Sequence, residues 1–264
     1  MKLPFLHAAP GRTLRKPAPT AMPTLEKSNV AALYRAARFG GDFFDFKVVE
    51  RHLVFVMMDI AGRRDEALDV AASAQESFHE EAGKLFGDCC VNEAEALSFL
   101  TVALNRQIME TANGVRCAPA FVGCYDEALG TLFYVNAGHT PGLLKDADGL
   151  TLLEANGLPF GLFTHATHDA QTSVLQPGAA VLLVSKGLIE SRHGRKHEFG
   201  LDRLKENVAR ASFKNATELC SGVLTAVQEF THNSPGQNDI TTLGLMRSEV
   251  RSGAEVMASV AALP

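Results

Sequence analysis

The sequence lacks any hydrophobic run long enough to cross a membrane, and it has no excess of positive charge. Its longest apolar runs, such as residues 179–184, are far shorter than the roughly 20 residues that a membrane-spanning helix needs. The net charge is -5, and no basic stripe is interleaved with aromatic residues. Because nucleic-acid-binding surfaces have that pattern, we expect neither a membrane span nor a nucleic-acid partner.

Cysteine is also scarce. The five cysteines are odd in number and lack C-x-x-C spacing. They indicate neither a disulfide framework nor a zinc site, so we expect the protein in a reducing cytoplasm.

What is present is typical of an ordinary globular protein, with 46% apolar and 21% charged residues in 264 positions. Residues 1–24 contain five prolines among basic and small residues and no continuous apolar core. They predict a flexible arm or linker rather than a secretory signal. Residues 248–264 predict a short tail or one weak helix. The folded domain is therefore expected over 25–247.

Apolar periodicity within this domain switches between strands and helices in an uneven order. Alternating or continuous apolar runs predict strands at 30–37, 42–49, 53–59, 118–125, 131–136, 142–145, 150–154, 168–174, 179–184 and 240–246. Helical spacing predicts helices at 62–86, 92–111, 201–211 and 216–231. Long helices inserted between groups of strands predict an α+β layered fold.

Two carboxylates stand at the edges of apolar stretches, where a hard divalent cation is readily held. Asp42 follows Gly-Gly, and Asp59 precedes Ile-Ala-Gly. Taken alone, Asp42 would more often be a turn residue after Gly-Gly than a metal ligand. Further short motifs follow in order: NAGHTP at 136–141, GLPFG at 157–161, SKGLIE at 185–190, Phe-Gly at 199–200 and NDIT at 238–241.

In this order the motifs resemble the SpoIIE/RsbU type of metal-dependent protein Ser/Thr phosphatase, the bacterial branch of the PPM class, over about residues 30–246. The resemblance implies a four-layer α-β-β-α sandwich of two antiparallel sheets flanked by helices. It also implies two Mn²⁺ or Mg²⁺ ions held by aspartates. Two such cations lower the pKa of a bound water and clamp the phosphoryl oxygens of a phosphoserine or phosphothreonine.

The same resemblance assigns the site residues. Asp42 and Asp59 match metal ligands, and the backbone carbonyl of Ile60 is a possible further ligand. Lys186 and Asn238 stand where the family has two more ligating aspartates. Half of the expected carboxylates are therefore replaced, and no catalytic residue is expected beyond these metal-site positions.

The replacements leave several arrangements open. An ammonium in place of a carboxylate about 4 Å from a cation reverses an interaction of about 4 kcal/mol per unit-charge pair, so weak or absent metal binding is expected. Lys186 either lies between Asp42 and Asp59 as a built-in cation, or extends to solvent and leaves a weak single-metal site. In a third arrangement, Asp239 or Asp45 rotates in as a substitute ligand.

The polar residues near the expected site also allow two interpretations. Arg63 and Arg64 are either surface charges at a helix start or a phosphate-binding pair facing the pocket. His139 is expected to anchor a loop through its ring. His165, His168, His193 and His197 are expected to be surface residues.

Two functions of different class follow. One is an active Mn/Mg-dependent phosphatase acting on a regulatory protein such as an anti-sigma-factor antagonist, with an atypical or single-metal site. The other is a pseudophosphatase that binds a phosphorylated regulatory protein or signalling partner, and the lost ligands favour it. By the resemblance, the helices near 63–111 would form a regulatory surface and a possible homodimer interface.

Overall fold

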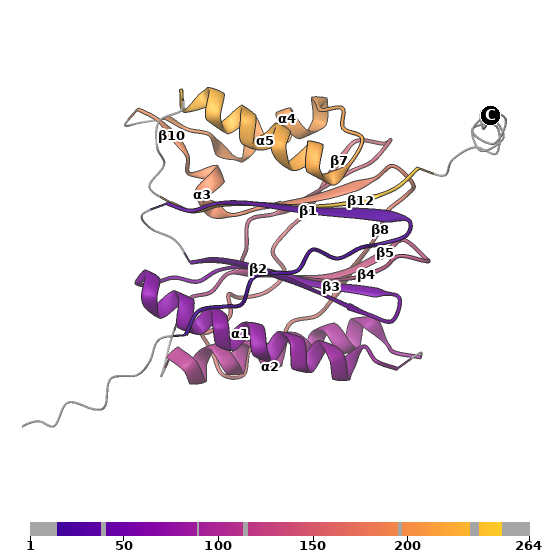
Figure 1. Cartoon of the computed structure of the whole chain (residues 1–264), viewed down its shortest axis with the longest axis vertical. Helices are drawn as coiled ribbons and strands as arrows, with labels where there is room; N and C mark the ends of the chain where they lie inside the picture. Colours follow the sequence, from indigo (N-terminus) through magenta and orange to yellow (C-terminus); the bar gives the residue numbers. More distant parts are fainter. Residues whose placement is uncertain are drawn as a thin grey trace, which may run out of the picture.

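The computed structural model describes residues 15–37, 41–88, 90–112, 116–194, 197–232 and 238–249. Two five-stranded antiparallel sheets pack face to face, and helices cover both outer faces (Figure 1). The predicted four-layer α-β-β-α sandwich is confirmed. Residues 1–14 of the predicted arm and 250–264 of the predicted tail lie outside the described residues.

The first sheet carries Asp42 and Asp59. In spatial order its strands are β2 (Asp42–Val49), β3 (His52–Asp59), β4 (Ala120–Asp126), β5 (Thr131–Ala137) and β8 (Gln171–Val174). Its outer face is covered by α1 (Arg64–Leu85) and α2 (Glu93–Ala112), below the sheet in Figure 1. Buried side chains from both helices and the strands form one apolar cluster.

The second sheet carries the other candidate positions. Its strands, in spatial order, are β1 (Ser28–Arg35), β12 (Ile240–Arg247), β9 (Ala180–Val184), β6 (Gly142–Lys145) and β7 (Leu150–Leu153). The helices α4 (Gly200–Arg210) and α5 (Ala216–Phe230) cover its outer face (Figure 1). Three short elements follow β9: α3 (Lys186–Ile189), β10 (Arg192–His193) and β11 (His197–Glu198).

The core between the sheets explains why the sequences of the central strands are continuous apolar runs. Every residue of β4 is buried, because one face packs on the helices and the other on the second sheet. Phe121 of β4 stacks on Phe55 and Tyr134, with ring centroids 6.3 and 5.3 Å away. The close packing of the sandwich holds the strand ends, and hence the site, in fixed positions.

The main strands and helices lie close to their predicted positions, but some details differ. The short elements α3, β10 and β11 were not predicted, because segments of two to four residues carry little periodicity. His168 is 2% exposed, packs against Phe160 and contacts the carbonyl of Leu158 through Nε2 at 2.8 Å. Its prediction as a surface residue is wrong.

The N-terminal residues that are described run along α1. Arg15 forms an ion pair with Glu76 at 2.8 Å, and the backbone of Ala18 exchanges hydrogen bonds with the side-chain amide of Gln75. Among the described helices, none is long and apolar enough to span a bilayer. Cys117, Cys124 and Cys220 are free thiols.

Candidate functional site

The sheet register brings the two aspartates together. Asp42 begins β2, Asp59 ends β3, and the two residues face each other as antiparallel partners. Beside them the backbones cross closely: the Ile60 N–H donates to the Gly41 carbonyl at 3.0 Å. A Cβ at Gly41 would overlap the Ile60 carbonyl oxygen, so the glycine before Asp42 is required for this approach.

The second sheet completes a cleft of about 270 Å³ at the same end of the sandwich. Two loops contribute, one following β9 into α3 and one preceding β12. The cleft is lined by Gly41, Asp42, Asp59, Ile60, Ala61, Gly62, Lys186, Gly187, Glu190, Asn238 and Asp239. The structure therefore gathers around one cleft both retained aspartates, Ile60, both replaced positions and Asp239, which come from motifs far apart in the chain.

Asp42 lies in a poorly solvated position. Its pKa is raised to about 7, mainly by burial and to a smaller extent by the nearby carboxylates of Asp59 and Asp239, although hydrogen bonds from Thr241 and Ser185 oppose the shift. The Thr241 hydroxyl donates to Asp42 Oδ2 at 2.7 Å. Without a bound cation, this carboxyl group is partly protonated near neutral pH.

Lys186 does not lie between the aspartates as a shared counter-ion. Its ammonium pairs with Glu190 Oε1 at 3.2 Å, and its side chain is 64% exposed. It still acts on Asp59 through space: burial raises the pKa of Asp59, the charge of Lys186 lowers it, and Glu190 and Asp239 raise it. The interpretation of Lys186 as a built-in cation between Asp42 and Asp59 is therefore wrong, because Glu190, four residues along, offers a closer partner.

The two neighbouring acidic candidates are already engaged. Asp239 is 3% exposed and accepts from the Tyr34 hydroxyl and the Ala37 N–H, both at 2.7 Å, with Arg64 3.5 Å away. The arrangement raises the pKa of Tyr34 to about 12, through burial first and then the contacts with Asp239. Asp239 therefore lines the cleft but already holds three partners.

Asp45 lies on the other side of β2, facing the helix layer. Its Oδ2 accepts from Gln75 Nε2 at 2.7 Å and contacts His79 Nε2 at 2.9 Å, and Oδ1 accepts from the Phe46 N–H. Since successive side chains of a strand point to opposite faces, Asp45 cannot replace a ligand in a cleft that Asp42 faces.

The two arginines differ in their surroundings. Arg64 begins α1 and contacts the carbonyl of Ala37 at 3.0 Å as well as Asp239 and Tyr34. Arg63 is the exposed residue before the helix. Arg64 thus ties β1 and the β12 loop to α1, whereas Arg63 has its charge at the surface.

Several residues of the site were missed by sequence reasoning. Glu190 binds Lys186 and lies 3.4 Å from the side-chain amide of Asn238. The position of Glu190, four residues after Lys186, was the sequence signal for this pair. Residues four apart lie on the same face only where the segment is helical. Thr241 and Tyr34 carried no motif that marked them as partners of Asp42 and Asp239.

His139 anchors a loop, as predicted. Its ring Nδ1 lies 3.1 Å from both the carbonyl and the hydroxyl of Thr140, and its backbone N–H donates to Asn136 Oδ1 at 2.8 Å. Burial lowers the pKa of His139 to about 4, so the ring is neutral near pH 7. It does not line the cleft.

This architecture, two packed antiparallel sheets with facing aspartates at one end, is that of the PP2C-type protein phosphatases of the PPM class. The chain belongs to the SpoIIE family: residues 50–248 match the family described as Stage II sporulation protein E (SpoIIE). Within the PPM class it is thus a SpoIIE-type domain.

Solved structures and a curated relative agree with this assignment. The RsbU and RsbW domains of Rv1364c from Mycobacterium tuberculosis are 27% identical, with a TM-score of 0.68 over 85% of this chain and 62% of that one. The SiaA-PP2C domain of Pseudomonas aeruginosa is 16% identical, with a TM-score of 0.69 over 82% and 84%. Protein IcfG of Synechocystis is 24% identical over 87% of this chain. The chain spans 39% of the length of IcfG.

Proposed function

We propose that this domain is a pseudophosphatase: it uses the SpoIIE-type fold to bind a phosphorylated regulatory protein or signalling partner, with dimetal catalysis lost or weak. The observation that carries the proposal is the Lys186–Glu190 ion pair at 3.2 Å in the cleft. It places a positive charge, and the carboxylate that balances it, where a catalytic site of this family would need oxygen ligands for cations.

The remaining donors do not fit a pair of Mn²⁺ or Mg²⁺ ions. These hard cations need several oxygen ligands, preferably charged ones. Asp42 is hydrogen-bonded by Thr241 and has a pKa of about 7, and Asp239 is held by Tyr34, Ala37 and Arg64. Asp59 and the Ile60 carbonyl remain as metal ligands without such competing partners. Two ligands of this kind are too few for two cations.

The same charges suit the binding of a phosphate group. A phosphoserine carries about -1.5 to -2 charges near pH 7 and strong acceptor oxygens. Lys186 is 64% exposed at the cleft, and Arg63 is exposed where the chain leaves the cleft to enter α1. An ammonium and a guanidinium make charge-assisted hydrogen bonds to phosphate oxygens. Arg64 supports this site by fixing the start of α1.

A protein partner is the occupant that the relatives support. The similar structure from Rv1364c contains an RsbU and an RsbW domain in one chain. A surface for a further contact exists on α2, where Phe99 is 56% and Val102 39% exposed. We include in the proposal a homodimer or a regulatory contact through the helices within 63–111. Neither needs a metal in the cleft.

An active phosphatase with a single metal is the second candidate. Glu190 favours it, because this carboxylate lines the cleft with Asp59 and partly offsets the lost aspartates. One divalent cation between these two groups would have to displace Lys186 from Glu190. This candidate therefore requires measurable metal affinity together with turnover.

Calorimetry with Mn²⁺ and hydrolysis of a generic aryl phosphate distinguish the two functions. The pseudophosphatase is expected to give no saturable Mn²⁺ heat below millimolar metal and negligible hydrolysis, but to bind phosphoserine peptides more tightly than their unphosphorylated forms. Replacing Lys186 by Gln should weaken that preference, whereas Lys205→Gln on α4 should not. A micromolar Mn²⁺ isotherm with turnover that Asp59→Asn abolishes would establish the active enzyme instead.

A further inference from the structure

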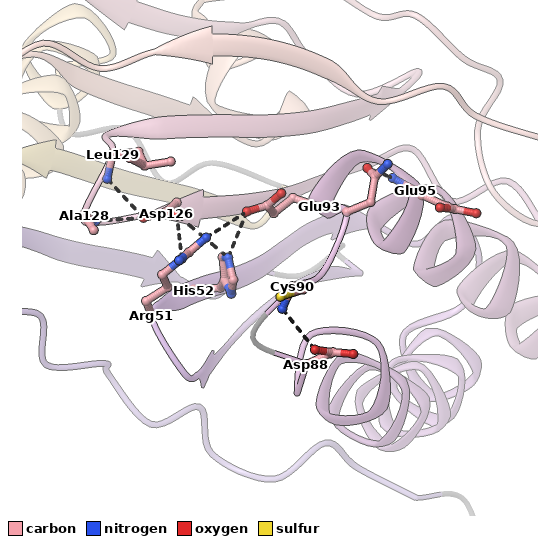
Figure 2. A network of polar contacts seen from close by, with 10 residues as sticks. Arg51, His52, Asp88, Cys90, Glu93, Glu95, Asp126, Ala128 and Leu129 are labelled. Atoms are coloured by element: carbon pink, nitrogen blue, oxygen red, sulfur yellow. Dashed lines mark hydrogen bonds and ion pairs between the residues drawn. The ribbon is translucent and has the colours of Figure 1, made fainter.

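A second group of metal-ligating side chains lies at the opposite end of the first sheet (Figure 2). His52 begins β3 and faces Asp126, the last residue of β4, as its antiparallel partner. Glu93 begins α2. Since β3 runs from His52 to Asp59, at about 3.3 Å per residue this cluster lies roughly 23 Å from the cleft. The two sites share no residue.

The three side chains converge on one point. One ligand atom from each lies within 4.8 Å of the other two. His52 Nε2 is 3.2 Å from Glu93 Oε1 and 4.0 Å from Asp126 Oδ2. His52 is 2% exposed, and the side chains of Asp126 and Glu93 are 0% and 16% exposed. Burial of two carboxylates at this spacing requires positive charge between them.

The two carboxylate oxygens of Asp126 have different roles. Its Oδ1 accepts from the N–H groups of Ala128 and Leu129, at 2.8 and 3.1 Å, and so closes the turn between β4 and β5. Its Oδ2 points into the cluster, where Arg51 Nε lies 2.8 Å away in an ion pair whose geometry is not that of a hydrogen bond. A buried carboxylate oxygen that is compensated only by a half-exposed arginine is costly, and this Oδ2 is the oxygen that a metal cation would bind.

Arg51 supplies the positive charge in this structure. Its Nε lies 2.8 Å from Asp126 Oδ2, and its terminal nitrogen lies 3.6 Å from Glu93 Oε1 (Figure 2). Unlike the three converging residues, Arg51 is half exposed, with 50% of its side-chain surface accessible. A long, flexible side chain of this kind can move its charge into water while its stem stays in place.

We propose that His52 Nε2, Glu93 Oε1 and Asp126 Oδ2 bind one divalent transition-metal cation of the Zn²⁺ class, with Arg51 leaving as the metal enters. An imidazole with two carboxylates is a donor set that suits Zn²⁺ better than Mg²⁺, which prefers oxygen ligands alone. His52 Nδ1 has no hydrogen-bond partner in the described part of the chain, so no bond there prevents Nε2 from presenting its lone pair.

The bound metal has a structural consequence. It would join the first turn of α2 to two central strands of the first sheet, in place of a half-exposed arginine. Binding only to the folded chain stabilises it. The site thus fixes α2, the helix that carries Phe99 and Val102, independently of whether the cleft binds a partner or a cation.

Titration of the full chain with Zn²⁺, followed by calorimetry and by thermal unfolding, tests the proposal. We expect one Zn²⁺ per chain at this site and a higher unfolding temperature with Zn²⁺. Arg51→Gln should bind Zn²⁺ more tightly, by roughly tenfold if the displaced ion pair is worth about 1.4 kcal/mol. A purely structural ion-pair cluster predicts the opposite: Arg51→Gln loses stability and gains no metal.

Matched variants locate the metal. Glu93→Gln and His52→Gln should abolish the Zn²⁺ isotherm. His79→Gln should leave it unchanged, because His79 lies on α1 and pairs with Asp45 of β2 at 2.9 Å, outside the cluster, and so should Asp59→Asn in the cleft. Absence of Zn²⁺ binding in both the unmodified chain and Arg51→Gln would overturn the proposal. Retention of binding in Glu93→Gln, whose position at a helix end makes it the variant safest for folding, would overturn it as well.

Discussion

Lys186 and Glu190 lie one helical turn apart beside Asp59, and their charged groups approach to 3.2 Å in the cleft. With Lys186 64% exposed, a pair of this kind contributes only about 0–1 kcal/mol to stability. Its effect is therefore on what the cleft binds rather than on folding. Lys186 acts on Asp59 through space, and its positive charge lowers the pKa of that carboxyl group.

Restoring the lost carboxylates tests this interpretation. In Lys186→Asp combined with Asn238→Asp, we expect saturable Mn²⁺ binding to appear, because both changes add negative charge beside Asp59 and release Glu190. Calorimetry at constant pH measures the isotherm. The change in unfolding free energy should be about 1 kcal/mol or less, since the lost surface pair is weak.

A control separates local from general charge effects. Lys205 on α4 forms a comparable surface pair with Asp202 at 2.8 Å, outside the cleft, so Lys205→Asp should not create Mn²⁺ binding. If the double variant folds and still does not bind Mn²⁺, then the side chains at 186 and 238 do not face a common cation position.

Much of the fold could be predicted because its signals are local and ordered. The helical spacing before Phe86 and the continuous apolar runs of β3 and β4 each follow from packing between layers. The pairing of Asp42 with Asp59 is also accessible, because the two residues are equally far from the tight turn at 50–51 that joins their strands.

The side-chain partners could not be predicted in the same way. Whether Lys186 turns toward Asp59 or Glu190 depends on a four-residue helix too short to leave a periodic pattern. The cluster of His52, Glu93 and Asp126 unites three elements with no shared motif. Such contacts are set by the tertiary packing, which the sequence signals only indirectly.

The raised pKa of Asp42 predicts a pH dependence of stability. The folded chain retains this proton up to about pH 7, whereas the unfolded chain loses it near the ordinary value of 3.8. Because the folded state binds more protons in this window, its stability falls as pH rises through it, by up to about 1.4 kcal/mol per pH unit. Below the window this loss is absent.

Asp42→Asn removes this titration while keeping an acceptor for the Thr241 hydroxyl. Urea unfolding of both proteins across pH 4 to pH 8 gives the difference. We expect the variant to gain stability relative to the unmodified chain as pH rises. A difference that does not change with pH would mean that Asp42 is solvated well enough to titrate normally.

Because the α3 and β12 loops are in close contact, one methyl group added between them is expected to lower the stability of the folded chain. A Cβ added at Gly187 would overlap the backbone carbonyl oxygen of Asp239, whereas one added at Gly222 of α5 would meet no atom within 4 Å. We expect Gly187→Ala to lower the unfolding free energy by roughly 1–3 kcal/mol through overpacking. Gly222→Ala should raise it by about 0.5–1 kcal/mol, because alanine loses less backbone freedom in a helix.

Urea unfolding of the two variants checks both signs. Equal effects would show that the loops carrying Lys186 and Asp239 are not held in contact, and the cleft would then lack the fixed geometry on which its proposed selectivity depends.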